Sequence, residues 1–174
     1  MALSLHSALI PSMMQVLGSV EGFVDKAHAW CDEHGHSHQE IIGARLIDDM
    51  LPFSYQVKSC WTHSAHAVAS AQTGLFTPEM SPPPDSFDGL RDKLAEATTM
   101  LSAVDEAELE NLAGNDMRFQ IGDRLRMDFT VQDFLLSFSQ PNFYFHAATA
   151  YDILRMKGLA LGKRDYLGAL RLKT

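Results

Sequence analysis

The feature that most constrains this chain is a long run of apolar residues spaced three and four positions apart near its start. A spacing of three and four matches the helical repeat of about 3.6 residues, so residues 4–33 are predicted to form one long helix with a single buried face. Pro11 lies inside the pattern and predicts either a kink or the true start of this helix. The buried stripe consists of Leu5, Leu9, Met13, Val16, Leu17, Val20, Phe23, Val24, Ala27 and Trp30.

Further helical patterns follow along the chain. A short helix is expected over 39–46, and a long one over 50–72 with Pro52 in its first turn. The four prolines between residues 77 and 85 cannot continue a helix and predict a surface connection. The next helix opens at residue 85 or 86 and is expected to fade in the acidic run 105–110, and the last begins near Pro141 and ends at Gly158.

Only one stretch has the alternation of a β-structure. Met117, Phe119 and Ile121 alternate with polar residues, and so do the apolar residues from Leu125 to Phe129. A three-residue loop, 122–124, pairs Ile121 with Leu125 and keeps the two apolar faces together. The sequence therefore predicts an all-α bundle of four helices with a small β-hairpin inserted before the last helix, in one domain over residues 1–174.

Charge and composition exclude several partners. With 14 Lys and Arg against 22 Asp and Glu, the net charge is −8, and no clustered basic face predicts nucleic-acid binding. No apolar run reaches the roughly 18 residues that span a membrane, and the first residues lack the basic segment of a signal peptide, so a cytoplasmic protein is expected. Cys31 and Cys60 are too few for a disulfide framework and are interpreted as buried small hydrophobic residues.

Histidine is the residue type that points to chemistry, with eight in the chain. His146 falls inside the apolar arc of the last helix and is predicted to point into the bundle, either as a metal ligand or general base or as a hydrogen-bonded core residue. His63 lies on the flank of the inward face of helix 50–72 and could turn either way. Asn142 lies one turn before His146, on the same side of the last helix.

A second histidine group lies at the end of the first helix. His28, Cys31 and His34 are spaced three residues apart, and His36 and His38 follow. Such a tract binds Zn²⁺ or Ni²⁺ adventitiously, but it lacks the defined four-ligand spacing of a structural site. We interpret it as a solvated helix end and loop, with a functional metal as the alternative.

Six sequence motifs carry a resemblance that covers nearly the whole chain. The chain is similar to a bacterial family of uncharacterised proteins within the DinB/YfiT-like superfamily of four-helix bundles. The motifs are Ser4-Leu5-His6 with Pro11, Asp49-Met50-Leu51-Pro52, Phe129-Thr130-Val131-Gln132-Asp133-Phe134, Pro141-Asn142-Phe143-Tyr144-Phe145-His146, Ala150-Tyr151-Asp152-Ile153-Leu154-Arg155 and Leu161-Gly162-Lys163-Arg164-Asp165.

The resemblance implies a divalent metal, zinc or nickel, bound by one histidine of the second helix and a His-x-x-x-His pair of the last helix. His63 matches the first ligand and His146 the end of the pair, whereas Asn142 replaces the other histidine with a weak amide oxygen donor. The implied function is a degenerate metal-dependent enzyme, similar to thiol transferases or hydrolases, with a pocket between helices two and four and Tyr144 or Tyr151 as proton carrier. The alternative is a scaffold or small-molecule-binding homodimer without metal; the resemblance implies a homodimer in either case.

Overall fold

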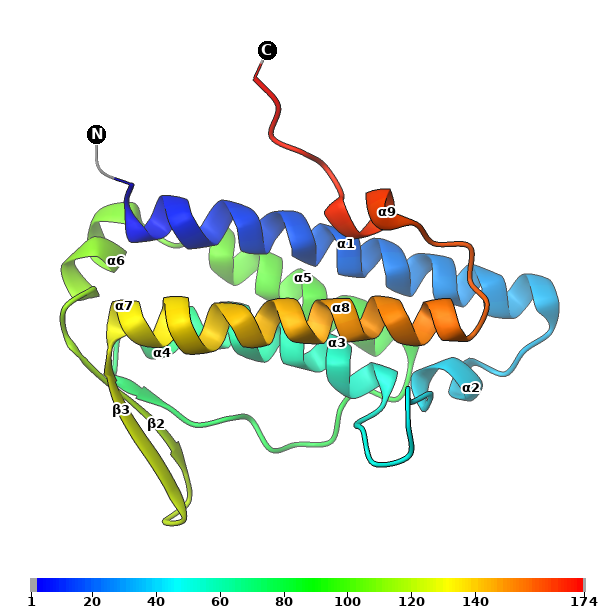
Figure 1. The fold of residues 1–174 in the computed structure, drawn as a ribbon, viewed down its shortest axis with the longest axis horizontal. Coiled ribbons are helices and arrows are strands. Elements are labelled where there is room, and N and C mark those ends of the chain that lie inside the picture. Colours follow the sequence, from blue (N-terminus) through cyan, green and yellow to red (C-terminus); the bar gives the residue numbers. More distant parts are fainter. Residues whose placement is uncertain (1–2, 174) are drawn as a thin grey trace.

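The computed structural model describes residues 3–173 and shows a helical bundle with a small sheet at one end (Figure 1). The bundle consists of α1 (Leu5–His34), α5 (Phe87–Ser102) and two composite helical segments. One composite is α3 (Phe53–Trp61), η1 (Thr62–His66) and α4 (Ala67–Ser70), and the other is α7 (Val131–Asp133), η2 (Phe134–Ser139) and α8 (Gln140–Met156). Both η elements are π-helical turns.

The helices pack in the order α1, α5, α3, α8 and back to α1. The first and second long segments are therefore diagonal to each other, so the bundle is not a plain array of sequential neighbours. The predicted apolar stripe of α1 forms much of the core: Leu9, Met13, Val20, Val24 and Ala27 are fully buried. Pro11 lies inside α1, and Gly35 ends the helix with a φ of 69°.

The two composite segments differ from the predicted helices. The second segment begins at Phe53, with Pro52 as its N-cap rather than in its first turn. The last helix, α8, begins at Gln140 with Pro141 in its first turn, as predicted, but it continues α7 and η2 without a break. The π turns within them were not predicted. A π turn holds an extra residue, so it rotates the residues around it relative to a regular α-helix and breaks the apolar spacing that sequence reasoning uses.

The predicted hairpin is confirmed, including its register. β2 (Asp116–Ile121) and β3 (Leu125–Thr130) are antiparallel, with Ile121 opposite Leu125 and Phe119 opposite Met127. A third strand, β1 (Leu75–Phe76), pairs with β2 in parallel and was not predicted, because two residues are too short to show an alternation. The ring of Phe76 stacks against that of Phe119, at 5.8 Å between centroids, and joins the sheet to the core.

The shorter helices also depart from expectation. α2 (His38–Ile42) is shorter than the predicted 39–46. The helix predicted to fade in the acidic run is interrupted instead: Asp105 accepts a hydrogen bond from the Glu108 amide and starts α6 (Glu106–Leu112). α9 (Lys163–Leu167) forms in the tail, which had no firm prediction, and lies against α1 (Figure 1). Among the described residues, no helix combines the length and apolar character that crossing a bilayer requires.

Candidate functional site between the second and last helical segments

The two π turns meet beside a hollow of about 300 Å³. Ser139, in η2, is fully buried and donates a hydrogen bond of 2.9 Å to the backbone carbonyl of His63, in η1. This contact links η1 to η2, and His63, Asn142 and His146 all line the hollow beside it. The hollow is lined by Tyr55, Lys58, Ser59, Thr62, His63, Pro78, Glu79, Met80, Ser81, Phe119, Ile121, Phe138, Asn142 and His146.

The protonation of His146 is set by a buried glutamine. Gln56 donates from Nε2 to the carbonyl of Leu51 at 2.8 Å, so its Oε1 must face the other way, where it lies 2.7 Å from Nδ1 of His146. Because an amide oxygen only accepts, Nδ1 of His146 carries the proton and Nε2 keeps a free lone pair. Burial lowers the pKa of His146 to about 4, so the imidazole is neutral near neutral pH.

His63 lies beside His146. The two rings are 5.5 Å apart between centroids and nearly parallel, at 13°. Nδ1 of His63 is buried and has no hydrogen-bond partner among the described residues. Burial first, and then the neighbouring His146 and His66, lower the pKa of His63 to about 3. The hollow thus contains two neutral imidazoles, and one of them has a buried nitrogen that no group in residues 3–173 satisfies.

Asn142 completes the predicted trio. Its amide Nδ2 donates to the carbonyl of Phe138 at 2.7 Å, which leaves Oδ1 free as an acceptor. The orphaned nitrogen of His63 and the free lone pair of His146, on neighbouring rings, fit a divalent metal, with His63, His146 and the Asn142 oxygen as the groups that could hold it.

The Pro-rich connection forms one wall of the hollow. Lys58 is buried, and its Nζ donates to the carbonyls of Glu79 and Ser81 and to Ser81 Oγ, and pairs with Glu79 Oε2 at 2.6 Å. The Lys58 hydrogen bond is the main cause that lowers the pKa of Glu79 to about 2. Since these partners occupy all three N–H groups of Lys58, the ammonium anchors the connection and is not a free amine.

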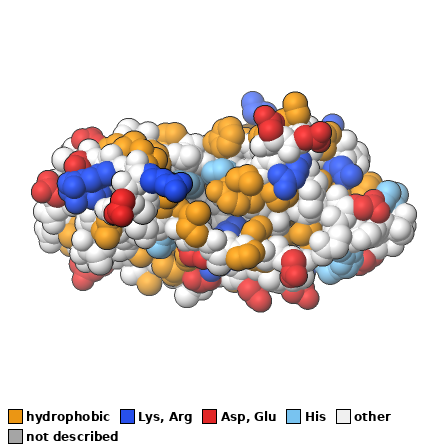
Figure 2. Space-filling model, turned by 90° about the horizontal axis from the view of Figure 1, so that it is seen from below, with side chains coloured by type: hydrophobic (Ala, Val, Ile, Leu, Met, Phe, Trp, Pro, Cys, Tyr) orange, Lys and Arg blue, Asp and Glu red, His pale blue; other side chains and the backbone are white. Residues whose placement is uncertain are grey.

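The rim of the hollow is apolar. Met80, on the Pro-rich connection, and Ile121, at the end of β2, are exposed. Both segments lie on the lower side of the molecule in Figure 1, and Figure 2 shows that this underside carries grouped apolar side chains with acidic and basic ones around them. A ligand of the hollow would therefore meet polar groups at the histidines and apolar groups at the mouth.

Sequence reasoning named the three residues but left the direction of His63 open and missed their surroundings. Neither Tyr144 nor Tyr151, the expected proton carriers, lines the hollow; the tyrosine that does is Tyr55, whose ring centroid lies 6.0 Å from that of His146. Gln56 was missed as a partner of His146, and its polar side chain on a buried helix was the only signal for it. Cys60 is buried in the core as predicted, and burial raises the pKa of its thiol.

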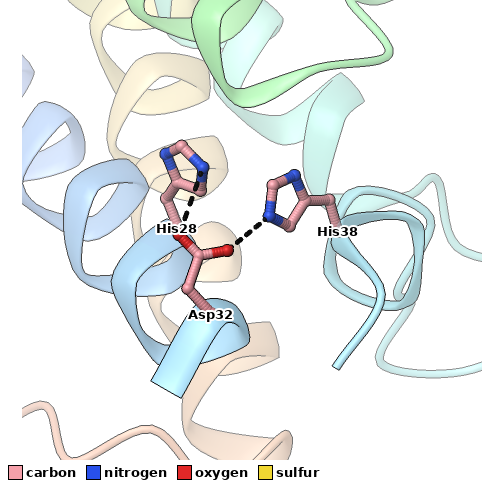
Figure 3. Close-up of side chains that lie close together, drawn as sticks. All are labelled: His28, Asp32 and His38. Carbon is pink, nitrogen blue, oxygen red and sulfur yellow. Dashed lines mark hydrogen bonds and ion pairs between the residues drawn. The ribbon is translucent and has the colours of Figure 1, made fainter. Parts of the chain in front are cut away.

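The other histidine group assembles differently from its sequence spacing. Cys31 is fully buried, and the Nδ1 atom of His34 pairs with the carbonyl of Trp30. The side chains that converge are His28 and Asp32, from the end of α1, and His38, from the start of α2 (Figure 3). The cluster is compatible with metal binding, and none of its residues lines the hollow.

The fold and the hollow together define the class: a DinB-like helical bundle with histidine and amide groups between its second and last helical segments. A crystal structure of a DinB family member from Shewanella denitrificans is similar, with 26% identity and a TM-score of 0.83 over 98% of this chain and 95% of that chain. The model of the family described as Domain of unknown function (DUF1993) matches residues 5–167, and the chain belongs to this family. No curated protein matches it.

Proposed function

We propose that the hollow binds a divalent transition-metal ion, zinc or nickel, through His63, His146 and the Asn142 oxygen, and that the rest of the hollow takes a small molecule. The observation that carries the proposal is the Gln56 hydrogen bond, which puts the proton of His146 on Nδ1 and leaves Nε2 as the basic atom. Metal-binding histidines commonly donate their other N–H to an oxygen in this way. The buried, unpartnered Nδ1 of His63 supports the same interpretation.

The chemistry of such a site follows from its donor set. When bound, the ion supplies Lewis-acid activation of a water or thiol. The chain's own residues orient the site: Gln56 fixes the ring of His146, and the Phe138 carbonyl fixes the amide of Asn142. Because an amide oxygen is a weaker donor than imidazole, we expect lower affinity than a three-histidine site has. The proposed activity is accordingly that of a degenerate thiol transferase or hydrolase.

A metal-free role is the second candidate, and one observation favours it. The Nδ1 proton of His146 already has a partner in Gln56, which is also how a core histidine is satisfied. In that case the chain is a scaffold or binds a small molecule in the hollow without metal. The pairing of two copies is proposed with either role, and sedimentation velocity of the untagged chain tests it.

Elemental analysis and Zn²⁺ titration of untagged protein distinguish the two roles. The metal proposal expects one hollow-bound ion that is lost in His146→Ala and in His63→Ala but kept in His66→Ala, a control on the same helical segment whose side chain does not line the hollow. The variant Asn142→His, which supplies a third imidazole, should bind tighter. If Asn142→His gains nothing and His146→Ala loses only stability, the metal role is overturned in favour of the scaffold.

A further inference from the structure

We propose a second divalent-metal site, separate from the hollow, formed by His28, Asp32 and His38 and controlled by Arg91. Figure 3 shows the two imidazoles directed at one carboxylate. Nε2 of His38 lies 2.9 Å from Asp32 Oδ1, and Nε2 of His28 lies 3.7 Å from Asp32 Oδ2. Two imidazoles and one carboxylate are a common ligand set for zinc and related ions, with a remaining position for water.

The ligand atoms are close enough for one ion. They all lie within 4.8 Å of one another, whereas a tetrahedral ion with bonds of about 2.1 Å spaces its ligands about 3.4 Å apart. An ion would therefore open the 2.9 Å contact between His38 and Asp32 and draw His28 closer. His28 and Asp32 are four residues apart on α1 and therefore share a face. The side chains of His28, Asp32 and His38 are 29%, 63% and 43% exposed, so an ion can reach them from solvent.

The two rings are also held in place. The ring of His28 stacks on that of Phe87, at 4.9 Å and 22°. The ring of His38 packs edge-on against both, at 4.6 Å from His28 and 5.2 Å from Phe87. Phe87 begins α5, so three helices fix the arrangement. Rings that are already oriented lose little freedom when they bind an ion, which favours a defined site over a chance surface pair.

Arg91 disfavours metal binding through its hydrogen bond to Nδ1 of His28. Its Nη2 donates to Nδ1 of His28 at 2.8 Å, and a guanidinium cannot accept, so the proton of the neutral ring is on Nε2, the atom that would bind the metal. Metal binding requires this proton to move to Nδ1, where it would face the Arg91 donor. Arg91 must therefore withdraw from His28, and its bonds to Asp25 and Asp88, both 2.7 Å, are independent of that contact.

Calorimetric titration of Zn²⁺ into the untagged full chain tests the site, with the stoichiometry compared between wild type and His146→Ala. In both backgrounds, Asp32→Asn, which keeps the shape of the side chain, and His38→Ala are expected to weaken one Zn²⁺ site at least about tenfold. His36→Ala is the matched control, because His36 is an equally exposed histidine paired with a carboxylate, Glu40, four residues away. Arg91→Met is expected to tighten the same site about tenfold.

The outcomes separate this proposal from the metal role of the hollow. Zn²⁺ binding that survives His146→Ala and disappears on adding Asp32→Asn supports the α1–α2 site whatever the hollow binds. Unchanged binding in Asp32→Asn, or an equal loss in His36→Ala, shows adventitious binding only and overturns the proposal. Because a variant could lose binding by unfolding, the Tm of each variant is also measured with and without Zn²⁺. If Zn²⁺ raises the Tm of Asp32→Asn as much as it raises the Tm of its parent, the proposal is likewise overturned. If Arg91→Met leaves the Zn²⁺ affinity of the site unchanged, the role proposed for Arg91 is refuted.

Discussion

The hydroxyl of Ser139 donates a hydrogen bond of 2.9 Å to the carbonyl of His63, and in doing so it joins one π turn to another. Ser139 ends η2 and His63 lies within η1, so the contact holds together the two irregular turns of the bundle. π turns leave backbone groups in unusual positions and recur at functional sites. Here the contact joins the turn that contains His63 to the turn that leads into α8, which carries Asn142 and His146.

Ser139→Ala should destabilise the fold by about 1 kcal/mol, because a buried carbonyl loses its side-chain donor. Urea unfolding measures the change. Ser137→Ala is the control, since Ser137 is in the same π turn but its hydroxyl bonds only to the carbonyl of Asp133, at an exposed position. Equal effects of the two substitutions would show that the link between the π turns contributes nothing to stability.

The site was predictable where the helices are regular. His146 lies on α8 after η2 has ended, so counting about 100° per residue from Asn142 placed it correctly toward the bundle. His63 lies inside η1, where that count fails, and the sequence left its direction open. The hairpin register was predictable because a three-residue loop, unlike a two-residue one, keeps its apolar residues on one face.

The surroundings of the site depend on contacts between residues far apart in sequence. From the sequence alone, Lys58 would be expected to be an exposed charge on a helix. In the structure it is buried, and Glu79 and Ser81 of the Pro-rich connection, some twenty residues later, stabilise its charge. The cluster of His28 with Asp32 and His38 likewise needs the chain reversal between α1 and α2. Neither spacing nor periodicity contains this information.

Replacing Gln56 with leucine should leave His146 free to adopt either tautomer. Without an oxygen to receive the Nδ1 proton, the ring is free to carry it on Nε2, and metal affinity of the hollow should fall by about 10- to 100-fold. Two-bond ¹H–¹⁵N spectra of the imidazole report which nitrogen is protonated. Gln72→Leu, at an exposed position after the same helical segment, is the control. A Gln56→Leu protein in which Nδ1 stays protonated would refute the role given to Gln56.

The lowered pKa values of His63 and His146 predict acid sensitivity. The folded pKa values are about 3 and about 4, below the unfolded value of about 6.5, so the unfolded chain takes up protons first as pH falls. The stability from the neutral rings is fully present above about pH 6.5 and decreases from there toward pH 4 and 3. Urea unfolding across this pH range should show that the free energy of unfolding falls less steeply with decreasing pH in His146→Gln than in the wild type. Parallel curves for the two proteins would contradict the prediction.

Lys58→Met tests the anchor of the Pro-rich connection. Methionine fills similar space but cannot donate, so the carbonyls of Glu79 and Ser81 lose their partner and the Glu79 carboxylate loses its cation. We expect a loss of about 2 kcal/mol in the free energy of unfolding, with faster proteolysis between residues 77 and 85, because the connection then loses its Lys58 hydrogen bonds to α3. Lys93→Met is the control: Lys93 is also a helical lysine paired with a carboxylate, Glu96, but the pair lies outside the hollow. Since a partly exposed pair of that kind contributes little, its loss should leave the cleavage rate unchanged, and equal cleavage of both variants would show that Lys58 does not secure the wall of the hollow.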